Sequence, residues 1–195
     1  KKSKVPLGRA FTLFTASVVI FTLGNSSNVF LILKAREAGL AASHIPLIWL
    51  TYNLVSSLSS PLFGHVSDWI GRKPVIFLSF LVYAAIYAGF GLASGLSTVW
   101  ILFACYGLYY GLSEGVFRAY VADLVGPERR ATAFGTFNTA VGIALVPASI
   151  IFGTLWDKFS SRDAVLVAAT FSLIAGVFFL LTQWGRTAER ESQIG

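Results

Sequence analysis

Four chemically active side chains recur at four-residue intervals within one long apolar segment: Tyr106, Tyr110, Glu114 and Arg118. In a helix this spacing places them on a single, slowly drifting face. Glu114 precedes Arg118 by four residues, which is the order that suits an ion pair within a helix. Two interpretations remain open: a structural Glu114–Arg118 pair, or a carboxyl group that binds a substrate or exchanges protons.

Two further patterns concern how such side chains would be positioned. Gly107, Gly111 and Gly115 form a stripe beside the first one, which predicts close contact with a neighbouring helix. A polar cluster that includes Asn25 and Asn28 interrupts another apolar run, and three-residue spacing puts the two amides on one helix face. Amides within a membrane need partners, so they either line a polar cavity or hydrogen-bond to neighbouring helices.

The sequence contains no catalytic constellation, since it lacks a phosphate-binding loop, a pair of zinc-binding histidines on one helix and a nucleophile elbow. Its two histidines, His44 and His65, have no metal-ligand partner at a useful spacing. We therefore expect no enzyme activity, no catalytic residue, no metal site and no cofactor. The single cysteine, Cys105, can form no internal disulfide.

The composition places these residues in a membrane protein. Of the 195 residues, 55% are apolar and only 12% are charged, whereas a soluble domain carries about 25% charged residues. The mean hydropathy is +0.72. The net charge of +6 does not indicate a nucleic-acid partner, because the basic residues lie between apolar runs. We expect the lipid bilayer to be the partner instead.

Six segments are long enough to cross a bilayer, which takes about 20 apolar residues. We expect each one to be a helix, because backbone in lipid must satisfy its own hydrogen bonds. The segments are approximately 10–33, 45–66, 75–96, 99–125, 131–156 and 164–184. The predicted fold class is therefore an all-α membrane protein: a single six-helix transmembrane domain over 1–195, with 185–195 as a cytoplasmic tail.

The basic residues predict the orientation of these helices. With the N-terminus in the cytoplasm, only Lys34, Arg36, Lys158 and Arg162 face outside, which leaves eleven of the fifteen lysines and arginines inside. The positive-inside rule then favours a multi-pass protein of the cell membrane, inner or plasma, with both termini cytoplasmic. The five tryptophans lie near the expected helix ends, as in an aromatic belt: Trp49, Trp69, Trp100, Trp156 and Trp184.

An internal repeat divides the chain. Gly64 and Asp68 close the second expected helix, and Gly153 and Asp157 close the fifth, both pairs at an offset of 89 residues. Residues 10–96 and 99–184 therefore look like two copies of a three-helix unit. An odd number of spans per copy inverts one copy relative to the other in the membrane, a feature of secondary transporters.

Two loops resemble the signatures of the major facilitator superfamily. The first is 64–73, although Trp69 stands where the family usually has a basic residue, and the second is 122–131. The resemblance covers essentially the whole chain. The polar run in the first helix and the end of the fifth look most like the C-terminal six-helix half of a twelve-span transporter. The signature residues are Gly64, Asp68, Gly71, Arg72, Lys73, Asp123, Glu128 and Arg129.

This resemblance implies secondary active transport of a small solute by alternating access, with a missing N-terminal half or an equivalent bundle as partner. It implies that the signature residues form a cytoplasmic latch; the alternative is a capped basic loop. From the residues themselves, Gly64 permits close helix approach, Gly71 permits a tight turn and Asp68 accepts hydrogen bonds from Arg72.

The resemblance also places the first and fourth expected helices on the substrate path. The candidate cavity-lining residues are Asn25, Asn28, Tyr106, Tyr110, Glu114 and Arg118. A different class of function stays open beside transport, namely a half-size transporter-like bundle that acts as a scaffold or subunit of a larger membrane assembly.

Overall fold

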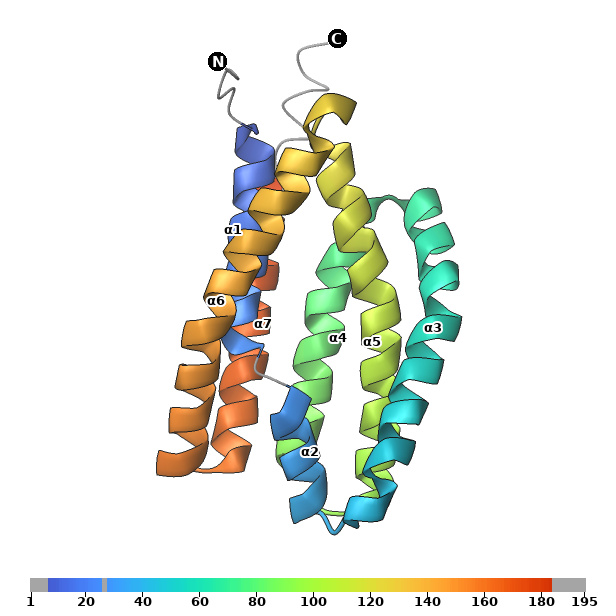
Figure 1. The fold of residues 1–195 in the computed structure, drawn as a ribbon, viewed down its shortest axis with the longest axis vertical. Helices are drawn as coiled ribbons and strands as arrows, with labels where there is room; N and C mark the ends of the chain where they lie inside the picture. Colours follow the sequence, from blue (N-terminus) through green and yellow to red (C-terminus); the bar gives the residue numbers. More distant parts are fainter. Residues whose placement is uncertain (1–6, 26–27, 184–195) are drawn as a thin grey trace.

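A computed structural model describes residues 7–25 and 28–183, and in these residues all regular structure is helical, as predicted. The helices form one elongated bundle, with the start of α1 and the end of α7 at the same end of it (Figure 1). The long helices are α1 (Arg9–Gly24), α2 (Asn28–Glu37), α3 (Ile45–Ile70), α4 (Arg72–Leu92), α5 (Leu96–Asp123), α6 (Arg130–Lys158) and α7 (Ser161–Gln183). Single 3-10 turns, η1 (Ala42–His44) and η2 (Pro127–Arg129), lead into α3 and α6. The expected tail at 185–195 lies outside the described residues.

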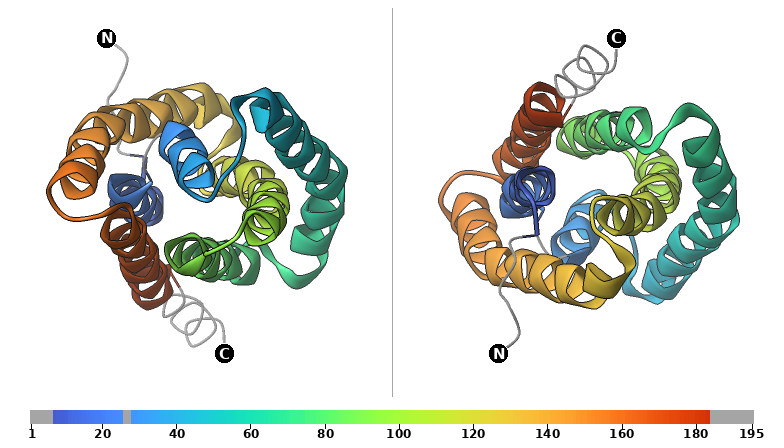
Figure 2. Two further views of the ribbon diagram at one scale, coloured as in Figure 1. Left: turned by 90° about the horizontal axis from the view of Figure 1, so that it is seen from below. Right: turned by 90° about the horizontal axis from the view of Figure 1, so that it is seen from above.

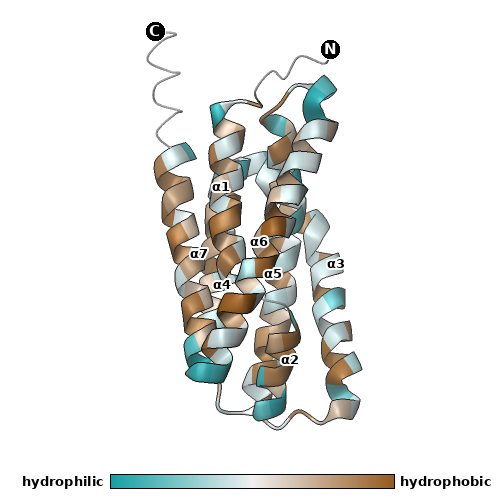
Figure 3. Cartoon of the chain, turned by 60° about the vertical axis from the view of Figure 1, so that its left-hand side comes forward, coloured by the Kyte–Doolittle hydropathy of each residue, from teal (hydrophilic) through white to brown (hydrophobic). Residues whose placement is uncertain are grey.

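Within the described residues, five segments are long and apolar enough to cross a membrane: Arg9–Glu37, α4, α5, Pro127–Lys158 and α7. The expected second span is a helix of 26 residues, α3, but it does not reach the apolarity of the other five. Polar residues such as Thr51, Asn53 and Ser56 interrupt it, and Figure 3 shows white and teal turns along α3 where α7 is largely brown. Of the six predicted spans, the one at 45–66 is thus confirmed as a helix, but it is not among the segments that are apolar enough to cross a membrane by themselves.

The first expected helix is not continuous. α1 ends at Gly24, where Asn25 has a non-helical backbone with φ −88° and ψ 90°, and α2 begins at Asn28. Asparagine favours such an end because its side chain competes with the helix for hydrogen bonds. Gly24 is required by packing, since a Cβ atom there would overlap Phe171 on α7. Ser26 and Ser27 lie outside the described residues.

Two glycines let α3 pack closely on α5. A Cβ atom at Gly107 would lie 2.5 Å from the carbonyl oxygen of Tyr52, and one at Gly111 would lie 3.0 Å from that of Ser56. At Gly115 the nearest neighbouring atom would be 3.9 Å away. The predicted close helix contact is thus confirmed at Gly107 and Gly111, and α3 is the neighbour.

The remaining helices complete the bundle around α4, α5 and α7. α4 packs on both α5 and α7, while α1 packs on α7 and α6. The end-on views of Figure 2 place α3 and α6 on opposite sides of the bundle. The end of α1 and the start of α2 lie beside α4, α5 and α6, because Asn25 bonds to Tyr83 on α4, Asn28 bonds to Tyr106 on α5, and both line a pocket together with α6.

Candidate functional site

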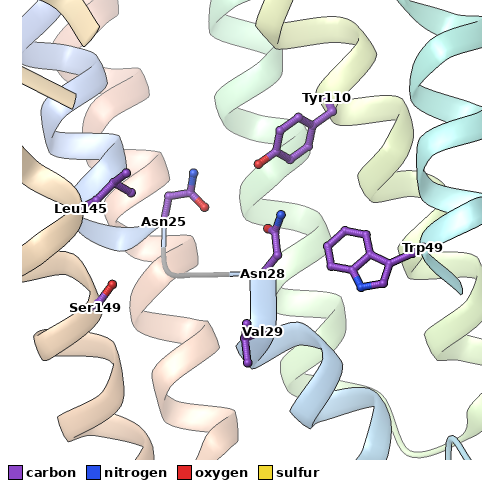
Figure 4. Close-up of a pocket in the computed structure, with 7 residues that line it drawn as sticks. All are labelled: Asn25, Asn28, Val29, Trp49, Tyr110, Leu145 and Ser149. Carbon is purple, nitrogen blue, oxygen red and sulfur yellow. The ribbon is translucent and has the colours of Figure 1, made fainter. Parts of the chain in front are cut away.

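A pocket of about 470 Å³ lies where α1 ends and α2 begins. Asn25 and Asn28 line it from the two sides of this junction, and the hydroxyl of Tyr110 points between them (Figure 4). The other lining residues are Val29 on α2, Trp49 on α3, and Leu145 and Ser149 on α6. Five helices thus contribute to one polar and aromatic pocket.

Buried tyrosines hold both asparagines. The Tyr83 hydroxyl on α4 donates to Asn25 Oδ1 at 3.1 Å, and the Tyr106 hydroxyl on α5 donates to Asn28 Oδ1 at 2.8 Å. Both tyrosine side chains are fully buried, so the bonds are shielded from solvent. The two interpretations of the asparagines therefore hold together: the amides bond to neighbouring helices, and they also line a cavity.

An aromatic wall lies behind the pocket. The ring centroid of Tyr52 is 5.2 Å from those of both Trp49 and Tyr110, and Tyr106 lies 5.1 Å from Tyr110. All three contacts are edge-to-face or near it, the geometry that aromatic pairs favour. The packing fixes the two rings that face the pocket, Trp49 and Tyr110. Trp49 therefore lines the pocket, a role that its expected place in an aromatic belt does not predict.

Glu114 and Arg118 form an ion pair with 2.6 Å between Oε1 and Nη2, but they do not line the pocket. Their side chains are 55% and 66% exposed in this chain. Four-residue steps drift by about 40° each around a helix, so the stripe does not stay on the face that lines this pocket, and a cavity role for Glu114 and Arg118 stays a prediction. Across the stripe this drift carries the face from the buried Tyr106 to the exposed Arg118.

The first signature loop forms an ion-pair cluster. Arg72 Nη2 lies 2.6 Å from Asp68 Oδ1, and Arg72 Nε lies 3.2 Å from Asp123 Oδ2. Arg72 Nη1 also donates to Ser67 Oγ at 2.6 Å. Gly71 has φ +90°, which confirms the tight turn between α3 and α4. We call Asp68, Arg72 and Asp123 the α3–α4–α5 cluster.

The other signature residues lie outside this cluster. Lys73 Nζ donates to the backbone oxygen of Gln183 at 2.6 Å, which joins α4 to the end of α7. Glu128 and Arg129 lie in η2, which precedes α6. A Cβ atom at Gly64 would meet no described atom within 4 Å, so no described helix packs closely there, and a close approach at Gly64 stays a prediction. The sequence spacing alone could not show which helix face would be covered.

Gln183 joins three helices at the same end of the bundle and was not expected from the sequence. Its side chain is almost fully buried. Its Oε1 accepts a hydrogen bond from Tyr120 at 3.1 Å, and its Nε2 donates to the backbone oxygen of Ala10 at 2.9 Å. The sequence signal for this role was a single amide side chain in the last turn of an apolar helix, because a polar group there needs hydrogen-bond partners on neighbouring helices.

A second polar contact closes the opposite end of the bundle. Lys34 Nζ lies 3.1 Å from Glu37 Oε2 and 2.9 Å from Ser161 Oγ, and Ser161 donates to Glu37 at 2.6 Å. These bonds join the end of α2 to the start of α7. Two spatial clusters, one at each end, therefore flank the pocket. In residues 7–25 and 28–183, no three His, Cys, Asp or Glu side chains gather as a metal ion would need.

Comparison with known proteins assigns the fold to a family. A sequence profile described as the Major Facilitator Superfamily matches residues 12–195. The chain belongs to this family. It is therefore an integral, multi-pass membrane protein of a family whose members are transporters.

Similar proteins occur in an archaeon, a bacterium and humans. The chain is 37% identical over 180 residues to an uncharacterised MFS-type transporter of Methanocaldococcus jannaschii, covering 89% of this chain and 45% of that one. It is 31% identical over 144 residues to the class C tetracycline resistance protein of Escherichia coli, at 71% and 35% coverage. It is 28% identical over 148 residues to human solute carrier family 67 member A1, at 73% and 34%. The chain thus spans less than half the length of these relatives.

Proposed function

We propose that this chain forms the C-terminal half of a secondary active transporter that moves a small solute by alternating access. The observation that carries the proposal is the pocket at the α1–α2 junction, where Asn25 and Asn28 are held by buried tyrosines. An interrupted membrane helix presents polar groups inside the bundle without a loop in lipid, and transporters bind their solutes at such interruptions.

The exposed surface of α3 and α6 supports the assignment to one half of a larger bundle. Large apolar side chains remain exposed on both helices, and these need cover from lipid or from another set of helices. Examples are Leu50, Leu54 and Leu58 on α3 and Ile143, Val146 and Ile150 on α6. We infer that an N-terminal half packs on parts of this surface and completes the pocket.

The ends of α3 and α6 support an inverted repeat. Asp68 lies near the end of α3, beside the end of α5, whereas Asp157 lies near the end of α6, at the opposite end of the bundle (Figure 1). Matching motifs at opposite ends are what two copies inverted in the membrane require. We place the Asp68 end in the cytoplasm on the distribution of lysines and arginines.

The α3–α4–α5 cluster serves, in this proposal, as the cytoplasmic latch. Its three charged side chains join the ends of α3, α4 and α5. When the cytoplasmic side opens, these helix ends must shift or move away from the partner half. Ion pairs of moderate strength suit such a role, because exposed pairs contribute only about 0–1 kcal/mol each and can re-form readily.

The experiment uses accessibility of the pocket from the two sides of the membrane. In full-length protein with Cys105 replaced by serine, Ser149→Cys introduces a thiol in the pocket, and Lys158→Cys introduces an exposed control thiol at one end. A membrane-impermeant thiol reagent is applied to right-side-out and to inverted vesicles. Alternating access requires Ser149→Cys to react from both sides and Lys158→Cys from one side only.

A scaffold or subunit without transport predicts a different result. The pocket thiol would then react from one side only, or from neither, under every imposed ion gradient. That outcome would contradict the proposed function directly, without requiring the identity of the solute.

A further inference from the structure

We propose that the pocket at the α1–α2 junction selects uncharged, flat aromatic compounds that carry hydrogen-bond acceptors, such as carbonyl or ether oxygens. This inference rests on the proposed transport function and names the class of solute for the same pocket. The orientation of the two asparagine amides is the observation that carries it.

Each amide oxygen already has a donor. Tyr83 donates to Asn25 Oδ1 at 3.1 Å and Tyr106 donates to Asn28 Oδ1 at 2.8 Å, both from fully buried positions. An amide nitrogen carries two N–H donors and no acceptor. Neither nitrogen donates to another group in the described part of the chain. The two amides therefore offer N–H donors to a bound molecule.

The rest of the polar lining agrees with this bias. The indole of Trp49 can donate a hydrogen bond but cannot accept one through its nitrogen. The hydroxyl groups of Tyr110 and Ser149 can do either. A solute with acceptor oxygens satisfies all of these groups, whereas a solute with only donors leaves the amide nitrogens without partners wherever it displaces their water, which is costly.

The charges around the pocket argue against an ionic solute. None of the described lining residues is Asp, Glu, Lys or Arg. Along α5 the acidic residue that follows Tyr110 is Glu114, which is already paired with Arg118 at 2.6 Å. Within the described lining, a cation would meet the positive ends of N–H dipoles with no carboxylate to balance them, and an anion would meet no cationic side chain.

The shape of the lining favours a flat, apolar body. Trp49 and Tyr110 present rings that are held in place by Tyr52, each with centroids 5.2 Å from it. Val29 and Leu145 add aliphatic surface. Aromatic rings can stack on or meet the edges of such side chains, and a pocket of about 470 Å³ falls in the range of sites for small organic ligands.

The test uses four three-ring probes of matched size: xanthone, which has a carbonyl and an ether oxygen; anthracene, which has no acceptor; N-methylacridinium, a fixed cation; and anthracene-9-carboxylate, an anion. Binding to the full-length protein in lipid nanodiscs is measured by equilibrium dialysis and corrected with protein-free nanodiscs. We expect xanthone to bind at least about fivefold more tightly than each of the other three, as one or two added hydrogen bonds would give.

A near-isosteric variant should invert this preference. Asn28→Asp replaces the N–H donors by a carboxylate oxygen, so xanthone should bind about tenfold more weakly and N-methylacridinium about tenfold more tightly. Asn138→Asp places the same charge on α6 outside the pocket lining and should leave the ranking unchanged. Tyr106→Phe removes the hydrogen bond that orients Asn28 without adding charge. This variant should weaken the binding of xanthone by about threefold and leave the binding of the other three probes unchanged.

Tighter binding of the cation or the anion to the unaltered protein would overturn the proposed solute class, as would a folded Asn28→Asp protein with an unchanged ranking. Failure of all four probes to bind, with Ser149→Cys still labelled from both sides, would overturn the solute class and leave transport standing. Loss of that two-sided labelling in otherwise unaltered protein would instead overturn the proposed function.

Discussion

Arg72 and Asp123 form an ion pair with 3.2 Å between Nε and Oδ2, although 51 residues of sequence separate them. The same guanidinium contacts Asp68 at 2.6 Å, so a single side chain at the start of α4 joins the ends of α3 and α5. The planar fork of N–H donors on arginine makes this double contact possible, and a lysine could not reproduce it.

Removing the charge of Asp68 should loosen the cytoplasmic end with little effect on folding. Asp68→Asn weakens one of the two ion pairs of Arg72, and the Asp68 side chain is 58% exposed, so the free energy of unfolding should fall by less than about 1 kcal/mol. Cytoplasmic labelling of Ser149→Cys should become about two- to fivefold faster. Asp157→Asn, an exposed carboxylate at the opposite end, is the matched control. Unchanged labelling would show that Asp68 only caps its loop.

The contact between α3 and α5 should tolerate a methyl group at one glycine and not at another. Gly111→Ala would push a Cβ atom against Ser59 and the Ser56 carbonyl, so we expect a loss of about 1–3 kcal/mol in the free energy of unfolding. Gly115→Ala lies on the same stripe with 3.9 Å to its nearest neighbour, and it should be neutral or slightly stabilising. Thermal unfolding of the two variants measures the difference, and equal stabilities would contradict the packing.

Glu114 and Arg118 should contribute little to folding. Because both side chains are more than half exposed, Glu114→Gln, Arg118→Leu and the double variant should each change the free energy of unfolding by less than about 1 kcal/mol. If Glu114 exchanges protons during transport, Glu114→Gln keeps the fold and abolishes proton movement into reconstituted vesicles. A loss of several kcal/mol in the single variants, rescued in the double variant, would instead establish a buried structural pair.

Gln183 should be more important for stability than its neighbours in α7. Gln183→Leu leaves the Tyr120 hydroxyl and the Ala10 carbonyl without their partner in a buried site, which should cost about 1–3 kcal/mol. Thr182→Val removes only a hydrogen bond within α7 and serves as the control. Comparable unfolding temperatures for both variants would argue against a joining role for Gln183.

The orientation in the membrane can be tested with two exposed positions at opposite ends of the bundle. In protein with Cys105 replaced by serine, Glu128→Cys should react with an impermeant thiol reagent only from the cytoplasm. Lys158→Cys should react only from outside. The reversed pattern would contradict the orientation inferred from the basic residues.

The sequence by itself determined the properties that depend on local composition and spacing. Long apolar runs predicted the membrane helices, since the bilayer imposes both length and hydrogen bonding on each run separately. The loop at Gly71 and Arg72 indicated both the turn and the family, because a positive φ and a short motif are local features. The glycine stripe likewise predicted a close helix contact, although not its partner.

Only the tertiary structure decided which side chains meet. The three-residue spacing of Asn25 and Asn28 predicted one helix face, yet the two residues lie on either side of an interruption. Tyrosines 58 and 78 residues away in the sequence orient their side chains. The four-residue stripe suggested one face for Tyr106 to Arg118, whereas the drift of the helix places Glu114 at the surface of this chain, outside the pocket lining. Trp49 and Ser149 joined the pocket through the packing of α3 and α6. These positions follow from how whole helices pack on one another, and no local pattern in the chain specifies that packing.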